Sequence, residues 1–148
     1  MCMTTSASAH GLSPAVIGSV RSEDICFEPF AAFPEGAEIA KVVGDPAARA
    51  PYVVRVKVAG GVRLMPHVHP EDRMYTVISG VFYIGFDTKF DADKLQTFGP
   101  GSVIVLPHGT PHFHWARSGE YITQVTGTGP LGIEYLDEND DPRSGLVK

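Results

Sequence analysis

The sequence predicts an all-β protein of a single domain, built as a sandwich, a jelly roll or a small barrel. Its 148 residues suffice for one ordinary domain. Twelve prolines and sixteen glycines divide the chain into short pieces, and no apolar stripe with the helical period of about 3.6 residues continues over three turns. Several pieces instead alternate apolar and polar residues, which is the pattern of a half-buried strand.

The strand candidates follow one another along the chain between turn residues. Residues 52–58 alternate valines with Arg55 and Lys57, which predicts a strand with one buried face. Residues 102–106 are apolar enough for burial on both faces, and residues 87–95 are predicted as a helical turn or an ordered loop between strands. Further strands are predicted at residues 74–79, 81–86, 120–126 and 131–136. Short strands at this spacing are typical of sandwiches and barrels.

The two ends of the chain differ from this pattern. Residues 1–22 are rich in small residues and are predicted as a flexible N-terminal arm, whereas residues 137–148 form an acidic C-terminal tail after a barrel at 23–136. The N-terminus lacks the basic start and apolar run of a signal peptide. No apolar stretch approaches the roughly 20 residues that span a bilayer. We therefore expect a soluble, cytoplasmic protein without a membrane role.

The charge of the chain excludes one class of partner. Lys and Arg number 12 against 17 Asp and Glu, a net charge of −5, and no basic cluster or stripe occurs. Nucleic-acid binders need such a cluster to neutralise phosphates. We expect no nucleic-acid partner.

The histidines are unevenly distributed, because five of the six fall between positions 67 and 114. His67 and His69 are two residues apart after a strand-like run, so both imidazoles would project from one face and could chelate one metal ion. His112 opens another strand after the turn that contains His108, and His114 shares its face. His108 itself is expected to be exposed.

Two segments of the chain resemble the two sequence motifs of the cupin family, over roughly residues 50 to 126. The first cupin motif runs from a glycine through His-x-His and a glutamate to a second glycine, and the second motif combines a glycine, Pro-x-Gly and a histidine. The matching residues of the first motif are Gly61, His67, His69 and Gly80, and those of the second are Gly101, Pro107, Gly109 and His112.

This resemblance implies a cupin-type jelly-roll β-barrel, also called a double-stranded β-helix. It implies one divalent transition metal (Zn, Fe, Mn, Ni or Cu) held by His67, His69 and His112 inside the barrel. It also implies a small-molecule ligand and a homodimer, since small cupins are commonly dimers.

The sequence departs from the cupin pattern at two positions. Ala116 stands at a variable asparagine position, and Arg73 stands where the motif has its metal-binding glutamate. A guanidinium has no lone pair to offer a metal. At about 6 Å it would repel a divalent ion by roughly 5–6 kcal/mol for an effective dielectric constant of about 20.

Three arrangements would resolve the conflict at Arg73. The side chain could turn aside and pair with Glu71 or Asp72, point inward as the receptor of an anionic substrate, or accompany the loss of the metal site. Glu71 is a weaker candidate for a replacement ligand, because Pro70 disrupts the alternation after His69.

The leading hypothesis is a metal-dependent cupin enzyme acting on a small anionic organic molecule, as a dioxygenase, a lyase or an isomerase. Arg73 would orient the anionic group, and His114 would serve as a fourth ligand or proton carrier, or merely as a hydrogen-bonded wall residue. The alternative is a non-catalytic cupin that binds or senses a small anion, with or without a metal.

Overall fold

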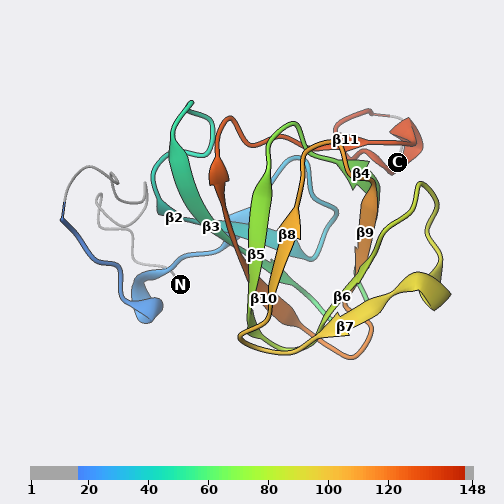
Figure 1. Cartoon of the computed structure of the whole chain (residues 1–148), viewed down its shortest axis with the longest axis horizontal. Coiled ribbons are helices and arrows are strands. Elements are labelled where there is room, and N and C mark those ends of the chain that lie inside the picture. The colour runs from blue at the N-terminus through green and yellow to red at the C-terminus, as the bar shows by residue number, and fades with distance from the viewer. Residues whose placement is uncertain (1–16, 146–148) are drawn as a thin grey trace.

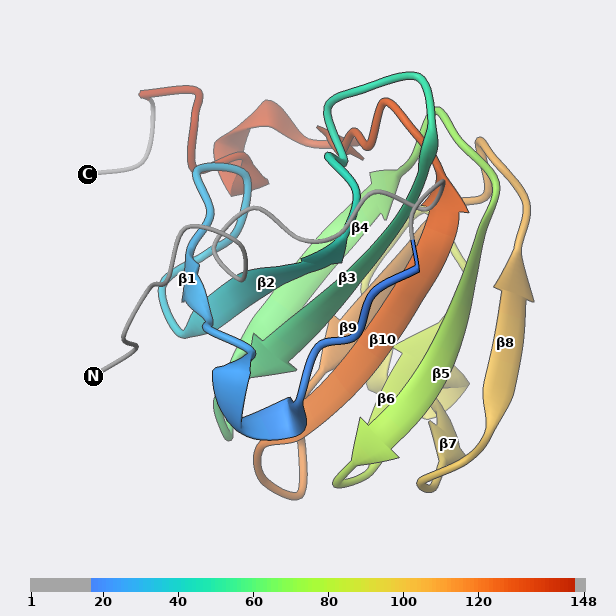
Figure 2. The ribbon, with the colours of Figure 1, turned by 90° about the vertical axis from the view of Figure 1, so that its left-hand side faces the viewer.

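The computed structural model describes residues 17–145, which form two antiparallel β-sheets packed face to face. Figure 1 shows strands of both sheets enclosing a common interior, and Figure 2 shows the larger sheet facing the viewer with the smaller one behind it. Among the described residues the only helical elements are short 3-10 turns, and loops connect the strands. The prediction of an all-β fold is confirmed.

The larger sheet has six strands in the order β1-β2-β3-β10-β5-β8. In Figure 2 they follow one another from left to right, with β8 at one edge. The strands are β1 (Glu28–Pro29), β2 (Ala37–Val43), β3 (Pro51–Val58), β5 (Arg73–Ser79), β8 (Val103–Leu106) and β10 (Tyr121–Thr128).

The smaller sheet has five strands in the order β11-β4-β9-β6-β7. They are β4 (Arg63–Val68), β6 (Phe82–Gly85), β7 (Gln96–Phe98), β9 (His112–Trp115) and β11 (Glu134–Tyr135). The 3-10 turns are η1 (Ser22–Asp24), η2 (Ala92–Lys94) and η3 (Glu138–Asp140). The η2 turn lies within residues 87–95, as the sequence predicts for that segment.

Alternation along the strands fills the interior. On β3 the side chains of Tyr52, Val54 and Val58 are buried, and on β10 Tyr121 and Val125 face the same core. Burying such a side chain contributes roughly 1.5–3 kcal/mol, so this apolar layer is the main source of stability. The polar cluster described below lies in the same interior, against residues of this core.

The tight turn between β5 and β6 depends on a glycine. Gly80 has a φ of +74°, a conformation that side chains disfavour, and a Cβ there would come within 2.3 Å of the carbonyl oxygen of Glu120. The second glycine of the first cupin-like motif is therefore required by the close approach of the β10 backbone.

Two strand predictions need correction. Residues 102–106 were expected to be buried on both faces, but Val103 and Val105 are 58% and 67% exposed, because β8 is an edge strand whose outer face nothing covers among the described residues. The strand predicted at 131–136 is shorter, since only Glu134 and Tyr135 pair with β4.

The ends of the described chain lie against the sheets. The segment before β1 crosses the outer face of the larger sheet (Figure 2), where Lys57 lies 4.6 Å from the ring centre of Phe27. Near the other end, Arg143 donates to the carbonyl of Ile133 at 2.7 Å. Most of the predicted arm, residues 1–16, and the tail residues 146–148 lie outside the described residues. In the described part, no helix has the length and apolarity to cross a membrane.

Candidate metal centre

Four histidines converge inside the barrel. His67 lies on β4, His69 follows the end of that strand, and His112 and His114 lie on β9, which pairs with β4. The pairing sets His67 directly opposite His112, with ring centroids 4.2 Å apart. All four side chains are buried, with at most 4% of each residue exposed. The pairing of β4 with β9 thus brings the two motif segments together, and alternation along the strands turns their histidines to one side.

Backbone carbonyls hold three of the imidazoles in one tautomer. The Nδ1 atoms of His67, His69 and His112 lie 2.6, 2.6 and 2.9 Å from the carbonyl oxygens of Met65, Gly132 and Thr110. A carbonyl can only accept, so each Nδ1 carries the hydrogen and donates it. Each Nε2 is left with a free lone pair. This is the outer hydrogen bonding that orients histidine ligands in metal sites.

The spacing of the lone pairs fits a shared cation. The Nε2 atoms of His69 and His112 are 3.2 Å apart, yet neither carries a hydrogen in the tautomers just derived. Two facing lone pairs repel unless something positive lies between them. Nitrogens bound at about 2.1 Å to one ion are separated by about 3.0 Å at a right angle and by about 3.4 Å at a tetrahedral angle. The observed separation lies between these values.

His114 belongs to the same cluster. One ligand atom from each of His67, His112 and His114 lies within 4.8 Å of the others. Unlike the other three, His114 has a buried Nδ1 without a hydrogen-bond partner among the described residues, and its ring stacks against Phe82 at 5.0 Å. The described group whose ligand atoms all lie this close is therefore His67, His112 and His114, whereas His69, a predicted ligand, is not part of it. The carboxylates of the described residues contribute nothing to this group.

The environment keeps the imidazoles neutral. Burial lowers the pKa of His67 to about 4, and burial together with neighbouring positive charge also lowers the pKa values of His69, His112 and His114. The Arg73 guanidinium contributes to the lowering at all four histidines. Neutral imidazoles are the form that binds metals.

Arg73 points inward and is paired with Glu71. Its Nη2 donates to Oε2 of Glu71 at 2.6 Å, and the two side chains are only 5% and 8% exposed. Glu71 also accepts from the hydroxyl of Tyr52 at 2.7 Å and, through Oε1, from the N–H of Gly132 at 3.2 Å. Of the arrangements considered for Arg73, the structure shows the pairing with Glu71, with the side chain buried beside the histidines; the role as receptor of an anionic substrate stays a prediction.

The fifth histidine of this stretch of sequence, His108, lies outside the group that could share a metal ion. His108 is exposed, and Oδ1 of Asp72 accepts from its backbone N–H and lies 2.8 Å from its Nδ1. Glu71 is committed to the bonds above and is not among the residues that could share a metal ion.

The interior space beside the histidines is small. Its volume is about 20 Å³, and its walls include His67, His69, His114, Arg73 and Tyr75. A space of this size accommodates about one water molecule. We call it the histidine chamber.

Known proteins share both the motifs and the fold. The sequence profile described as "Cupin" matches residues 51–129, more than half of the chain. The chain belongs to the cupin family. A putative germin-like protein 8-1 from Oryza sativa subsp. japonica is 36% identical over 66 residues, which are 43% of this chain and 30% of the rice protein. This cupin therefore matches less than a third of that relative's length.

Solved structures agree on the architecture. The polyketide cyclase RemF from Streptomyces resistomycificus superposes with a TM-score of 0.71 at 18% identity, over 86% of this chain and 91% of the cyclase. An RmlC-like cupin from Ralstonia eutropha JMP134 has a TM-score of 0.62 at 19% identity, over 87% of this cupin and 82% of that protein. The predicted cupin-type jelly roll is confirmed.

Sequence reasoning missed part of the machinery of this cupin. It considered Glu71 as a partner of Arg73 but not Tyr52 or Gly132, which fix the Glu71 carboxylate. These residues are 19 and 61 positions away along the chain, and no local pattern connects them. One sequence signal could have placed Tyr52 inside the barrel. It stands two residues before Val54 on the same strand, so the two side chains lie on the same inner face.

Proposed function

We propose that this cupin is a metal-dependent enzyme that acts on a small, anionic organic molecule. One divalent transition metal would be held by His67, His69 and His112, with His114 as a fourth ligand. The observation that carries the proposal is the pair of unprotonated Nε2 atoms 3.2 Å apart, each fixed by an Nδ1 bond to a backbone carbonyl. When bound, the ion would supply Lewis-acid polarisation of a substrate oxygen.

The donor set favours a lyase or isomerase type of reaction over a dioxygenase. Non-haem iron oxygenases commonly use two histidines and one carboxylate. In this chain the carboxylate position of the motif is Arg73, and the described group that could share an ion is made of histidines. Zinc, nickel, copper, manganese and iron remain candidates, since imidazole suits several of them.

The expected charge of the substrate follows from the same donors. Neutral imidazoles leave the charge of a divalent ion uncompensated, and Glu71 is already paired with Arg73. A carboxylate or enolate oxygen would supply the missing negative charge. Arg73 retains a buried Nε without a partner among residues 17–145, which is available to orient such a group.

Elemental analysis of protein purified without added metal tests the proposal. We expect about one ion per chain in the wild type, and less than about 0.1 in His112→Ala even after reloading. His108→Ala is the matched control, because His108 is exposed and hydrogen-bonded to Asp72. A wild-type protein that neither retains nor takes up metal contradicts the proposal.

One observation favours a second function, a non-catalytic cupin that binds a small anion. The histidine chamber of about 20 Å³ is too small for an organic substrate. A thermal-shift screen of carboxylates and phosphates separates the two functions, because a binding protein would respond to them without turning them over. The homodimer and the cytoplasmic location stay predictions.

A further inference from the structure

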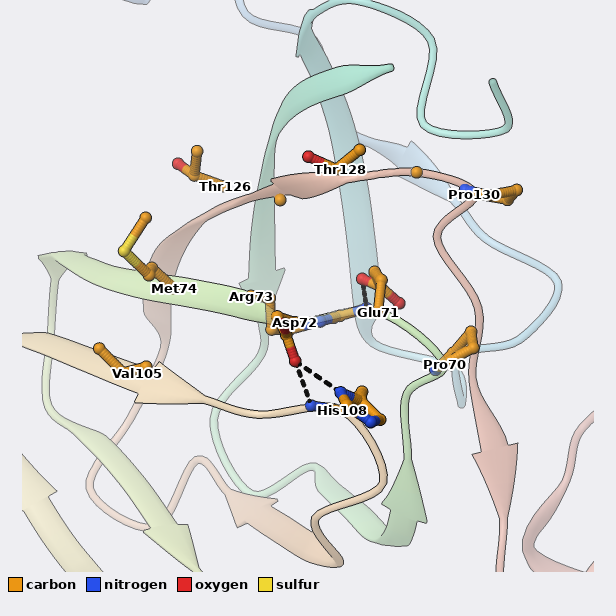
Figure 3. Close-up of a pocket in the computed structure, with 12 residues that line it drawn as sticks. Pro70, Glu71, Asp72, Arg73, Met74, Val105, His108, Thr126, Thr128 and Pro130 are labelled. Carbon is orange, nitrogen blue, oxygen red and sulfur yellow. Dashed lines mark hydrogen bonds and ion pairs between the residues drawn. The ribbon is translucent and has the colours of Figure 1, made fainter. Parts of the chain in front are cut away.

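An open groove lies on the surface next to the Glu71–Arg73 pair (Figure 3). Its volume is about 760 Å³, within the range of roughly 300–1,000 Å³ that small-molecule sites occupy. Its walls come from the ends of β5, β8 and β10 and from the segment that follows β10. Besides the ion pair they include Met74, Val105, Thr126, Thr128 and Pro130.

Arg73 separates this groove from the histidine chamber. It is the one described residue that lines both spaces. Its guanidinium donates through Nη2 to Glu71, while its Nε is buried and lacks a hydrogen-bond partner among the described residues. An arginine side chain carries five N–H donors. The Arg73 guanidinium can therefore donate hydrogen bonds to a second anionic group as well as to Glu71.

Backbone hydrogen bonds hold the segment that follows β10, next to the Glu71–Arg73 pair. The segment after β10 is bound by the N–H of Gly129 to Ala50 and by the N–H of Leu131 to Pro46, at 2.9 and 2.7 Å. A Cβ at Gly127, which pairs with Arg73 across the strands, would come within 2.8 Å of the Tyr52 hydroxyl. A passage from the groove to the chamber thus depends on a side chain and requires no loop movement.

We propose that the groove is the substrate-binding site of this cupin and that it takes an organic carboxylate, whose carboxylate group pairs with Arg73 and thereby opens the way to the histidine chamber. This inference rests on the proposed function and names its substrate class. It also reconciles an enzymatic role with a chamber of about 20 Å³, because the organic body of the ligand stays in the groove.

The charges around the groove permit this exchange. When Arg73 turns to a ligand, the Glu71 carboxylate keeps the Tyr52 hydroxyl and the Gly132 N–H as donors. The rim carboxylate of Asp72 is engaged by His108. The methionine, valine and proline side chains offer apolar contact to the body of the ligand, and the threonine hydroxyls offer hydrogen bonds.

Two valines of β8 provide a matched test of binding. Val103 and Val105 both point outward and are both exposed, but only Val105 lines the groove. Titrations of metal-free protein with benzoate and with neutral benzamide, followed by NMR, measure the ligand preference. We expect benzoate to bind at least about tenfold more tightly than benzamide, and Val105→Trp to weaken benzoate by at least about tenfold while Val103→Trp leaves it unchanged.

A second measurement follows access to the chamber. Pyridine-2,6-dicarboxylate captures a bound metal ion either at the histidines or after the ion has left the chamber, so in both cases the rate of removal reports passage into or out of the chamber. We expect Val105→Trp to slow this removal from zinc-loaded protein by about tenfold or more, and Val103→Trp to leave the rate within about twofold of wild type. Slower removal in the first variant alone supports the groove as the route.

The outcomes separate this inference from the proposed function. If wild-type protein holds no metal, the enzymatic proposal fails, while the benzoate titration still decides whether the groove is a carboxylate site. If metal binds but both tryptophan variants behave like wild type, the metal site stands and the groove is refuted. Equal binding of benzoate and benzamide overturns the role of Arg73.

Discussion

The polar groups around the histidines are satisfied in different ways on the two walls of the barrel interior. On the side of the smaller sheet, His67, His69 and His112 donate through Nδ1 to backbone carbonyls. On the side of the larger sheet, Arg73 depends on a side-chain carboxylate and keeps a buried Nε without a partner among residues 17–145. Backbone partners fix a geometry, whereas a side-chain partner can be exchanged. The first wall is suited to hold an ion and the second to admit a ligand.

The largest expected effect on stability comes from removing the negative charge of Glu71 on the second wall. Breaking a buried ion pair by changing one partner typically costs roughly 3–5 kcal/mol. We expect Glu71→Gln to lose about that much free energy of unfolding in urea titrations of metal-free protein. Asp72→Asn is the matched control, because its carboxylate is 75% exposed, and it should change stability by less than about 0.5 kcal/mol.

The double variant Glu71→Gln/Arg73→Met shows whether the loss of stability in Glu71→Gln comes from the Arg73 guanidinium, which is then buried without a counter-charge. Replacing both partners of a buried pair is often nearly neutral, so most of the stability should return. Zinc affinity should follow the same pattern, with a loss of at least about tenfold in the single variant and recovery in the double variant. A double variant that is as unstable as Glu71→Gln and binds zinc as weakly contradicts the view that Glu71 shields the histidines from the charge of Arg73.

The pH dependence of the metal-free protein tests the first wall. Burial lowers the pKa of His67 to about 4, whereas the unfolded chain takes up the proton near pH 6.5. Between these values the unfolded state binds more protons, so the stability present above pH 6.5 is lost as the pH falls towards 4. For this one histidine the loss amounts to roughly 3 kcal/mol.

Urea titrations at several pH values measure this slope. His67→Gln removes one of the four buried histidines with a lowered pKa, so the slope between pH 6.5 and 4 should fall by the share of that one histidine. Bound metal should shift the loss of stability to lower pH, because protons then compete with the ion for Nε2. A slope that is unchanged in His67→Gln would show that the acid sensitivity arises elsewhere.

Local patterns predicted the shared faces of the histidines on the first wall, whereas on the second wall they gave Glu71 only as one alternative partner of Arg73 and did not give Tyr52 or Gly132. His67 and His69, or His112 and His114, share a face because strands alternate, and two residues of spacing suffice to infer this. The partners of Glu71 are brought together only by the sheet order and by the path of the chain after β10. The same reason explains the error at Val103 and Val105, since an apolar run looks alike in a central strand and at an edge.

The smallest expected effect distinguishes charged from neutral hydrogen bonds of two buried tyrosines in the barrel interior. Tyr52 donates to the Glu71 carboxylate at 2.7 Å, and Tyr135 donates to the carbonyl oxygen of Ala32 at 2.6 Å. Bonds to charged groups contribute roughly 1.5–3 kcal/mol and neutral ones about 1 kcal/mol. We therefore expect Tyr52→Phe to cost more free energy of unfolding than Tyr135→Phe. In the Glu71→Gln background the cost of Tyr52→Phe should fall to about that of Tyr135→Phe, because the acceptor is then neutral. An undiminished cost would mean that Tyr52 stabilises the fold by packing rather than by holding the carboxylate against Arg73.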